Sequence, residues 1–153
     1  MRNRSLEEII QTEFNFLFKV FHFRPIQTGN DSKLFDNEGF DISNGKTIVS
    51  FQKDRGQLLI DIGYPRLPRL KWYDLSIIIK AITGENIDTY KFTEKNISLT
   101  TEEQAQNLSP LLKKYCAELL SGNWSIEPKI INTQIEWGKE ALRKLNTKKN
   151  ITQ

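Results

Sequence analysis

The residue types that most often perform chemistry in proteins are scarce in this sequence. It contains one histidine, His22, and one cysteine, Cys116. A general base or a zinc site needs a partner nucleophile or a second ligand, and the chain has no second histidine. Cys116 is in phase with Leu112 and Leu119 on an apolar helical pattern, which is typical of a buried and unreactive thiol. We therefore predict a structural or surface role for His22 and a core position for Cys116.

The carboxylates form one cluster that could hold a divalent metal, composed of Asp31, Asp36, Glu38 and Asp41. A calcium loop requires a fixed order of oxygen ligands, a glycine at the sharp turn and a closing glutamate, and this order is missing. A metal-dependent nuclease would need an acid two residues before Lys53, where Phe51 stands. We predict no metal site. The alternative is a metal-dependent hydrolase that uses Asp31, Asp36, Asp41 and Asp61.

Other catalytic motifs are also missing from the sequence. The eight glycines are isolated, and none precedes the Lys-Ser/Thr pair of a phosphate-binding loop. No serine stands in the glycine-flanked turn of an esterase. These absences predict that the protein is not an enzyme and that it uses no cofactor.

The composition predicts one folded domain in a reducing compartment. The chain has 153 residues, of which 38% are hydrophobic and 27% are charged, so it can bury a core beneath an ordinary solvated surface. A single cysteine makes no internal disulfide, and acidic residues interrupt the apolar positions near the N-terminus, unlike a secretion signal. We expect a cytoplasmic protein that does not associate with membranes, with a single α+β domain over residues 1–146 and a flexible polar tail over 147–153.

Local patterns predict the elements of this domain. Ser5 and Glu8 form a capping box, and apolar residues at three- and four-residue spacing predict a helix over 6–21. An antiparallel β-meander is expected next, over residues 34–43, 46–53 and 57–64. Asn44-Gly45 between the first two strands is typical of a type I′ turn.

The second half of the chain is predicted to be mainly helical. Asp74 and Gly84 are suited to cap a short helix through Ile82, and Thr100 begins a second capping signature. That helix either kinks at Pro110 or ends there, and a last helix is expected over 133–145. Residues 85–99 offer one further strand. The fold class is therefore α+β, a meander of three to four strands packed against four to five helices.

The candidate binding residues are arginines and tryptophans, which are enriched at interface hot spots. They are Arg66, Arg69, Trp72 and Trp124. The first three lie in a segment with two prolines that could be extended and exposed. The alternative is a connecting loop whose apolar residues pack into the core.

The charge of the chain is uneven. The formal net charge is +3. Residues 64–73 carry +3 and residues 143–149 carry +4, so the remainder carries −4. A nucleic-acid-binding accessory domain that uses the two basic stretches is a further alternative, but a mildly acidic remainder does not favour nucleic acid as the partner.

The predicted meander over 35–64 with its Asn44-Gly45 turn, and the later helix that ends near Trp124, together resemble bacterial immunity proteins. These proteins neutralise toxins of polymorphic-toxin and contact-dependent growth inhibition systems. The resemblance covers residues 30–125 and concerns architecture, without a signature motif. It implies a non-enzymatic protein that binds one cognate toxin domain and occludes its active site. Partners of cationic nuclease toxins tend to be strongly acidic, so the basic charge of this chain points to another kind of toxin.

Overall fold

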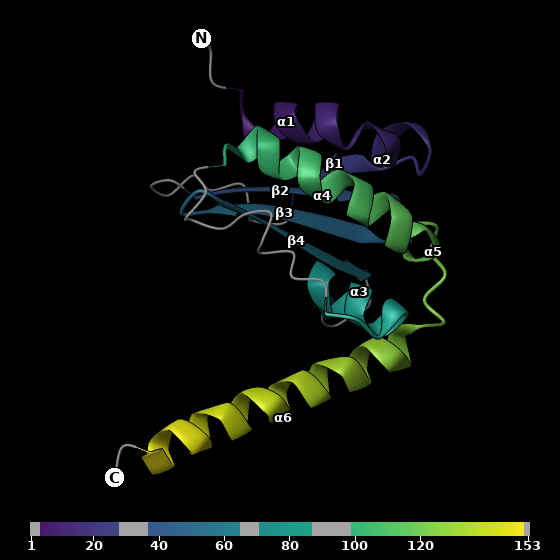
Figure 1. The fold of residues 1–153 in the computed structure, drawn as a ribbon. Coiled ribbons are helices and arrows are strands. Elements are labelled where there is room, and N and C mark those ends of the chain that lie inside the picture. Colours follow the sequence, from purple (N-terminus) through teal and green to yellow (C-terminus); the bar gives the residue numbers. More distant parts are fainter. Residues whose placement is uncertain (1–3, 28–36, 65–70, 87–98, 152–153) are drawn as a thin grey trace.

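The described residues form one antiparallel sheet with helices packed around it. The computed structural model describes residues 4–27, 37–64, 71–86 and 99–151 (Figure 1). The strands are β1 (Arg24–Ile26), β2 (Glu38–Ser43), β3 (Ile48–Asp54), β4 (Gln57–Tyr64) and β5 (Lys71–Asp74). The helices are α1 (Leu6–Glu13), α2 (Asn15–Lys19), α3 (Leu75–Thr83), α4 (Thr101–Tyr115), α5 (Ala117–Leu120) and α6 (Glu127–Ile151). This confirms the α+β class, with five strands and six helices in the described ranges.

The sheet has its strands in chain order, so each strand pairs with its neighbour in sequence. The predicted meander is confirmed by β2, β3 and β4. On one face, Phe40 pairs with Phe51 and Phe51 with Ile60, and all three side chains are buried. Figure 1 shows α1 and α4 lying along one side of the sheet. The Phe14 ring lies 4.9 Å from that of Phe51, so this apolar face is the one that the N-terminal helices cover.

The expected helix over 6–21 is divided into α1 and α2 by Phe14. The backbone of Phe14 leaves the helical region, with φ −112° and ψ 35°. Its side chain is fully buried against Phe51. The predicted capping by Ser5 is confirmed, since its hydroxyl accepts from the Glu8 amide at 3.2 Å. Apolar periodicity therefore predicted the buried face correctly but gave no sign of the break.

The three other predicted caps are confirmed. Asp74 accepts from the Ser76 amide at the start of α3, and Gly84 ends that helix at φ 76°. Thr100 and Glu103 form the reciprocal bonds of a capping box at the start of α4. Pro110 lies inside α4, which continues to Tyr115. The further strand expected within 85–99 falls mostly on residues outside those described.

The turn of the first hairpin differs from the type I′ turn that was predicted. A type I′ turn requires two successive positive φ angles. Gly45 has φ 86°, but Asn44 is not among the residues with positive φ. Instead, Asn44 Oδ1 accepts hydrogen bonds from the amides of Lys46 and Thr47. Two successive positive angles occur in the next hairpin, at Arg55 (52°) and Gly56 (84°).

Three features at the ends of these elements were not predicted. The three-residue strand β1 pairs with β2, and it contains Pro25, which is tolerated at the edge of a sheet. The four-residue β5 forms the other edge. Helix α6 is 25 residues long, whereas a helix over 133–145 was expected. It runs through residues 147–151 of the segment that was predicted to be a flexible tail.

We predict that Gly63→Ala lowers the free energy of unfolding by about 2–3 kcal/mol, because a Cβ atom at this position would lie 2.2 Å from the backbone oxygen of Lys71. Gly138→Ala is the matched control. It adds the same methyl group in open space on a helix, where alanine raises stability by up to about 1 kcal/mol. Urea denaturation measures both changes. Equal effects of the two substitutions would contradict the inference that the backbone of Lys71 leaves no room for a side chain at Gly63.

Candidate protein-binding surface

The start of α6 is fixed to the sheet by one carboxylate that bridges two tyrosines. Glu127 Oε1 accepts from the Tyr64 hydroxyl at 2.8 Å, and Oε2 accepts from the Tyr73 hydroxyl at 2.9 Å. Tyr64 comes from β4 and Tyr73 from β5, while Glu127 lies in the first turn of α6. A carboxylate in that place also interacts favourably with the N-terminal end of the helix dipole. We call these three side chains the Glu127 anchor.

Beyond the anchor, α6 leaves the core. Ile130 is buried and Ile131 packs against the core cluster, and α3 is the helix that contacts this part of α6. We call residues 135–151 of α6 the arm. Figure 1 shows α6 extending past α3 and away from the sheet.

The arm carries large apolar side chains that the described residues do not cover. Five large hydrophobic residues in the described ranges are exposed, and all but Val20 lie on the arm. The exposed fractions on the arm are 51% for Ile135, 56% for Trp137, 61% for Leu142 and 60% for Leu145. Scattered exposed apolar residues are ordinary, but a group of them on one helix indicates an interaction site.

These residues follow the spacing of a helix-pairing seam. Ile131, Ile135, Gly138, Leu142 and Leu145 alternate at intervals of four and three residues, so they occupy one stripe along the helix. We call these five residues the α6 seam. Trp137 lies outside the seam, about 120° around the helix from its centre. This signal was present in the sequence, but the glycine at the centre and the surrounding charges weakened it.

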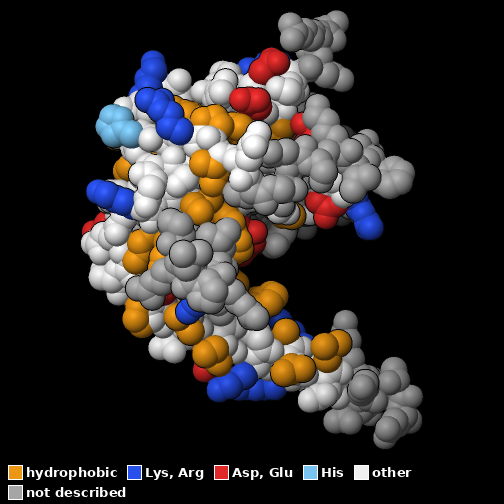
Figure 2. All heavy atoms as spheres, turned by 180° about the vertical axis from the view of Figure 1, so that it is seen from behind, with side chains coloured by type: hydrophobic (Ala, Val, Ile, Leu, Met, Phe, Trp, Pro, Cys, Tyr) orange, Lys and Arg blue, Asp and Glu red, His pale blue; other side chains and the backbone are white. Residues whose placement is uncertain are grey.

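The arm and the rest of the molecule enclose a hollow. Figure 2, which views the molecule from behind, shows α6 reaching away from the body so that the described surface has the outline of a C. Hydrophobic side chains are visible along α6 in this view. A protein segment could therefore contact α6 without displacing any described part of the core.

The sequence-predicted binding residues do not gather on one described surface. Trp124 packs against the core: its ring centroid lies 4.6 Å from that of Tyr64, and Nε1 donates to Thr47 Oγ1 at 3.1 Å. Trp72 is half-buried beside Gly63. Because side chains alternate along a strand, Trp72 projects from the face opposite Tyr73, which itself stacks near Trp124. Arg66 and Arg69 lie outside the described residues.

The one histidine and the one cysteine of the chain lie in different surroundings. Cys116 is fully buried, which confirms its predicted core position, and burial raises the pKa of its thiol to about 12. His22 is exposed in a turn with φ 61°.

The structure brings acidic residues together in a way that the sequence did not predict. Asp41 pairs with Ser50, Ser50 with Asp61, and Asp61 with Asp74 across four strands. Burial, together with the negative charges of Asp74 and Asp41, raises the pKa of Asp61 to about 6. Of the acids proposed for a hydrolase, Asp31 and Asp36 lie outside the described residues, and Asp41 and Asp61 lie in this row. Glu38, a member of the acidic cluster considered as a metal site, belongs to the other face of the sheet.

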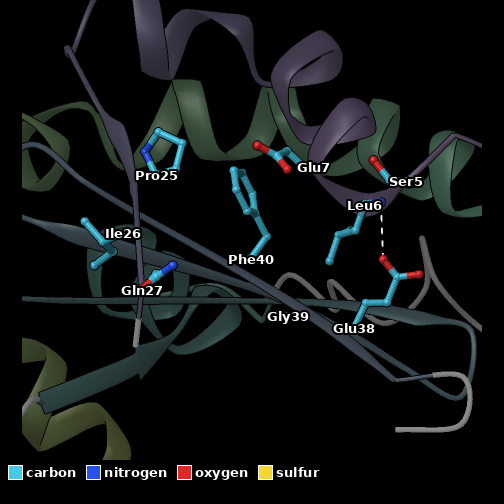
Figure 3. A pocket seen from close by; sticks show the side chains of 9 residues that line it. All are labelled: Ser5, Leu6, Glu7, Pro25, Ile26, Gln27, Glu38, Gly39 and Phe40. Carbon is cyan, nitrogen blue, oxygen red and sulfur yellow. Dashed lines mark hydrogen bonds between the residues drawn. The ribbon is translucent and has the colours of Figure 1, made fainter. Parts of the chain in front are cut away.

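A pocket of about 420 Å³ lies between the start of α1 and strands β1 and β2. Figure 3 shows the Phe40 ring between Pro25 and Glu7. The carboxylate of Glu38 faces the Leu6 amide and accepts from it at 3.4 Å. The residues that line the pocket include no histidine, cysteine or lysine. Glu38 thus serves chiefly as a partner for the free amides at the start of α1.

Two features are absent from the described ranges. Within these ranges, no three side chains among His, Cys, Asp and Glu are placed to hold a metal ion. No helix in the described part of the chain has both the length and the apolar character needed to cross a membrane.

We predict that Asp61→Asn stabilises the protein at neutral pH. The pKa of about 6 exceeds the usual value of about 3.9, so the folded state binds the proton more tightly than the unfolded chain does. The free energy of unfolding should therefore fall as the pH rises from about 4 to about 6. Asp61→Asn should be about 1 kcal/mol more stable than the parent at pH 7.5, allowing for solvent screening, and this gain should shrink at pH 4.5.

Asp54→Asn is the control for this prediction, because Asp54 is exposed at the end of β3. Chemical denaturation at several pH values measures both variants. A gain for Asp61→Asn that does not depend on pH would contradict the titration of Asp61.

We predict that Glu127→Ala lowers the free energy of unfolding by about 2 kcal/mol, because two partly buried hydroxyls lose a charged acceptor. Glu136→Ala is the matched control on the same helix. Its exposed carboxylate makes one ion pair, with Lys139 at 3.8 Å, and its loss should cost at most about 0.5 kcal/mol. Thermal unfolding followed by circular dichroism compares the two. If they are equally stable, the anchor does not hold α6.

Comparison with known proteins gives no relative: no family model, no curated protein and no solved structure matches this chain.

Proposed function

We propose that this protein is a non-enzymatic protein-binding protein, an immunity protein that neutralises a cognate bacterial toxin by occluding its active site. The exposed apolar group on the arm is the observation that carries the proposal. The arm adds to, and does not replace, the surface predicted from the sequence at Arg66, Arg69, Trp72 and Trp124.

The arm has the chemistry of a protein-binding surface. Tryptophan is enriched among the residues that contribute most to interface affinity, and Trp137 is more than half exposed. Leu142 and Leu145 supply further exposed apolar area on the seam side of the same helix. Covering a large aliphatic or aromatic side chain contributes roughly 1.5–3 kcal/mol relative to leaving it in water, so a partner that covers these residues gains a substantial free energy of binding.

The charges of the arm indicate the kind of surface that it would meet. Arg143 and Lys144 are exposed on the arm, and Lys148 and Lys149 follow in the sequence. A toxin surface that presents apolar residues beside acidic ones would complement this end of the protein. Complementary charges mainly speed association and select the partner, while the apolar contacts supply the affinity.

The hollow supports occlusion as the mechanism. A toxin segment that inserts between the arm and the body would be covered from two sides (Figure 2). The Glu127 anchor fixes the base of the arm, so less conformational freedom is lost when the partner binds. Neutralisation then requires only that the covered segment include, or lie beside, the active site of the toxin.

We expect a toxin domain to be encoded next to the gene for this protein, and the test uses that domain. We expect the parent chain to bind it and to rescue growth, and we expect Trp137→Ala and Leu142→Ala each to weaken binding at least tenfold by calorimetry, about 1.4 kcal/mol or more. Val20→Ala is the matched control. Val20 is 63% exposed but lies at the end of α2, and its substitution should change affinity less than twofold.

Failure of the parent chain to bind or rescue would eliminate the proposal for that toxin. Binding by the two arm variants equal to that of the parent would remove the arm from the binding surface.

A further inference from the structure

We infer that a second copy of this chain covers the α6 seam when no other partner is bound, with the two α6 helices paired side by side and antiparallel. This inference rests on the proposed function only in taking α6 as a protein-binding surface. It adds a resting state in which the apolar residues of the arm are protected from water.

The spacing of the seam is the first argument. The four-and-three alternation from Ile131 to Leu145 keeps apolar residues facing one neighbouring helix over two heptads. An apolar face that packs on a sheet is usually broader. Only the beginning of the seam is used inside the molecule, where Ile131 packs against the core, whereas Ile135, Leu142 and Leu145 are exposed. The free part is therefore suited to a second helix.

The glycine at the centre of the seam favours one orientation. In a parallel pair each residue faces its own copy, so Gly138 would lie opposite Gly138 of the second copy and leave a gap. In an antiparallel pair centred near position 140, Gly138 lies opposite Leu142 of the other copy. A Cβ at Gly138 would meet nothing within 4 Å in the single chain, so space for that leucine is present. Large residues opposite small ones pack well.

The same antiparallel register aligns the remaining seam residues. Ile135 of one copy lies opposite Leu145 of the other. This pair of residues occurs twice in the dimer, once beside each Gly138. Positions 131 and 149 are opposed at the ends of the pair. With a rise of about 1.5 Å per residue, the two bodies are separated along the helix axis by roughly 27 Å. Each body therefore lies beside the end of the other copy's arm.

The charges on α6 favour the antiparallel orientation as well. Acidic residues lie before position 141, at Glu127, Glu136 and Glu140, and the segment 141–149 contains four cations and no acid. A parallel pair would bring the cationic ends together. The antiparallel pair instead places Arg143 and Lys144 near Glu136 of the second copy, and the two helix dipoles then oppose each other favourably.

The first experiment measures the mass of the purified chain alone by light scattering and analytical ultracentrifugation. We expect about twice 17.9 kDa at about 100 μM and dissociation on dilution, because two heptads form a weak pair. Leu142→Glu places a charge in the seam and should give a monomer. Thr147→Glu is the matched control, since it adds the same charge on the opposite side of the helix, and it should leave the dimer intact. Circular dichroism checks that both variants are folded.

The second experiment determines the orientation with two single-cysteine additions, Ile135→Cys and Leu145→Cys. The native Cys116 is fully buried, so it contributes little to crosslinking in the folded protein. Under mild oxidation an antiparallel pair should give a mixed disulfide between the two variants and little of either symmetric product. A parallel pair should give the two symmetric products when each variant is oxidised alone.

Each result decides the inference. A parent chain that is monomeric at about 100 μM, a dimer that survives Leu142→Glu, or crosslinking in the symmetric pattern would overturn it. None of these results decides the proposed function, which is judged by whether the parent chain binds the toxin and rescues growth. Conversely, a dimer with the mixed disulfide would support the inference even if the toxin does not bind.

Discussion

The placement of α6 depends on the two hydrogen bonds that Glu127 accepts from Tyr64 and Tyr73. These bonds tie the first turn of the helix to β4 and β5, the last two strands of the sheet, at the end away from β1. Ile130 adds the nearest apolar contact by entering the core one turn later. These contacts hold the start of α6 in place. The direction of its remaining turns is therefore set by the contacts at one end of the helix. The exposure of the apolar residues of the arm follows from that arrangement.

A second set of polar contacts joins the β2–β3 turn to the helices. Asn44 donates to the backbone oxygens of Phe21 and Leu120. Thr47 donates to the Leu119 oxygen and accepts from Trp124. The β2–β3 turn thus donates hydrogen bonds to carbonyls at the end of α5 and just after α2, where helix termini leave acceptors without a partner in the helix. It also fixes Trp124 just before α6 begins. Trp124, selected from the sequence as a binding residue, therefore has a clear role in packing.

The parts of the fold that the sequence predicted are those set by local chemistry. Caps such as Thr100 with Glu103 depend on residues three apart, and the meander depends on alternation within each strand. The break at Phe14 was not predictable in this way, because it accompanies the burial of one ring against Phe51. Strand β1 exists through its pairing with β2. The acidic row across the sheet depends on strand register, and the exposure of α6 depends on what the rest of the chain leaves uncovered.

The chain-order sheet has a consequence for synthesis in the cell. Each strand finds its partner in the residues just made, and contacts between near neighbours in sequence form quickly. Strands β1 to β5 and the helices that cover them can associate as the ribosome extends the chain, whereas α6 leaves the exit tunnel last. The helix that carries the exposed apolar side chains thus emerges only after a folded sheet exists to hold its base. This order shortens the time in which a nascent chain could aggregate through those side chains.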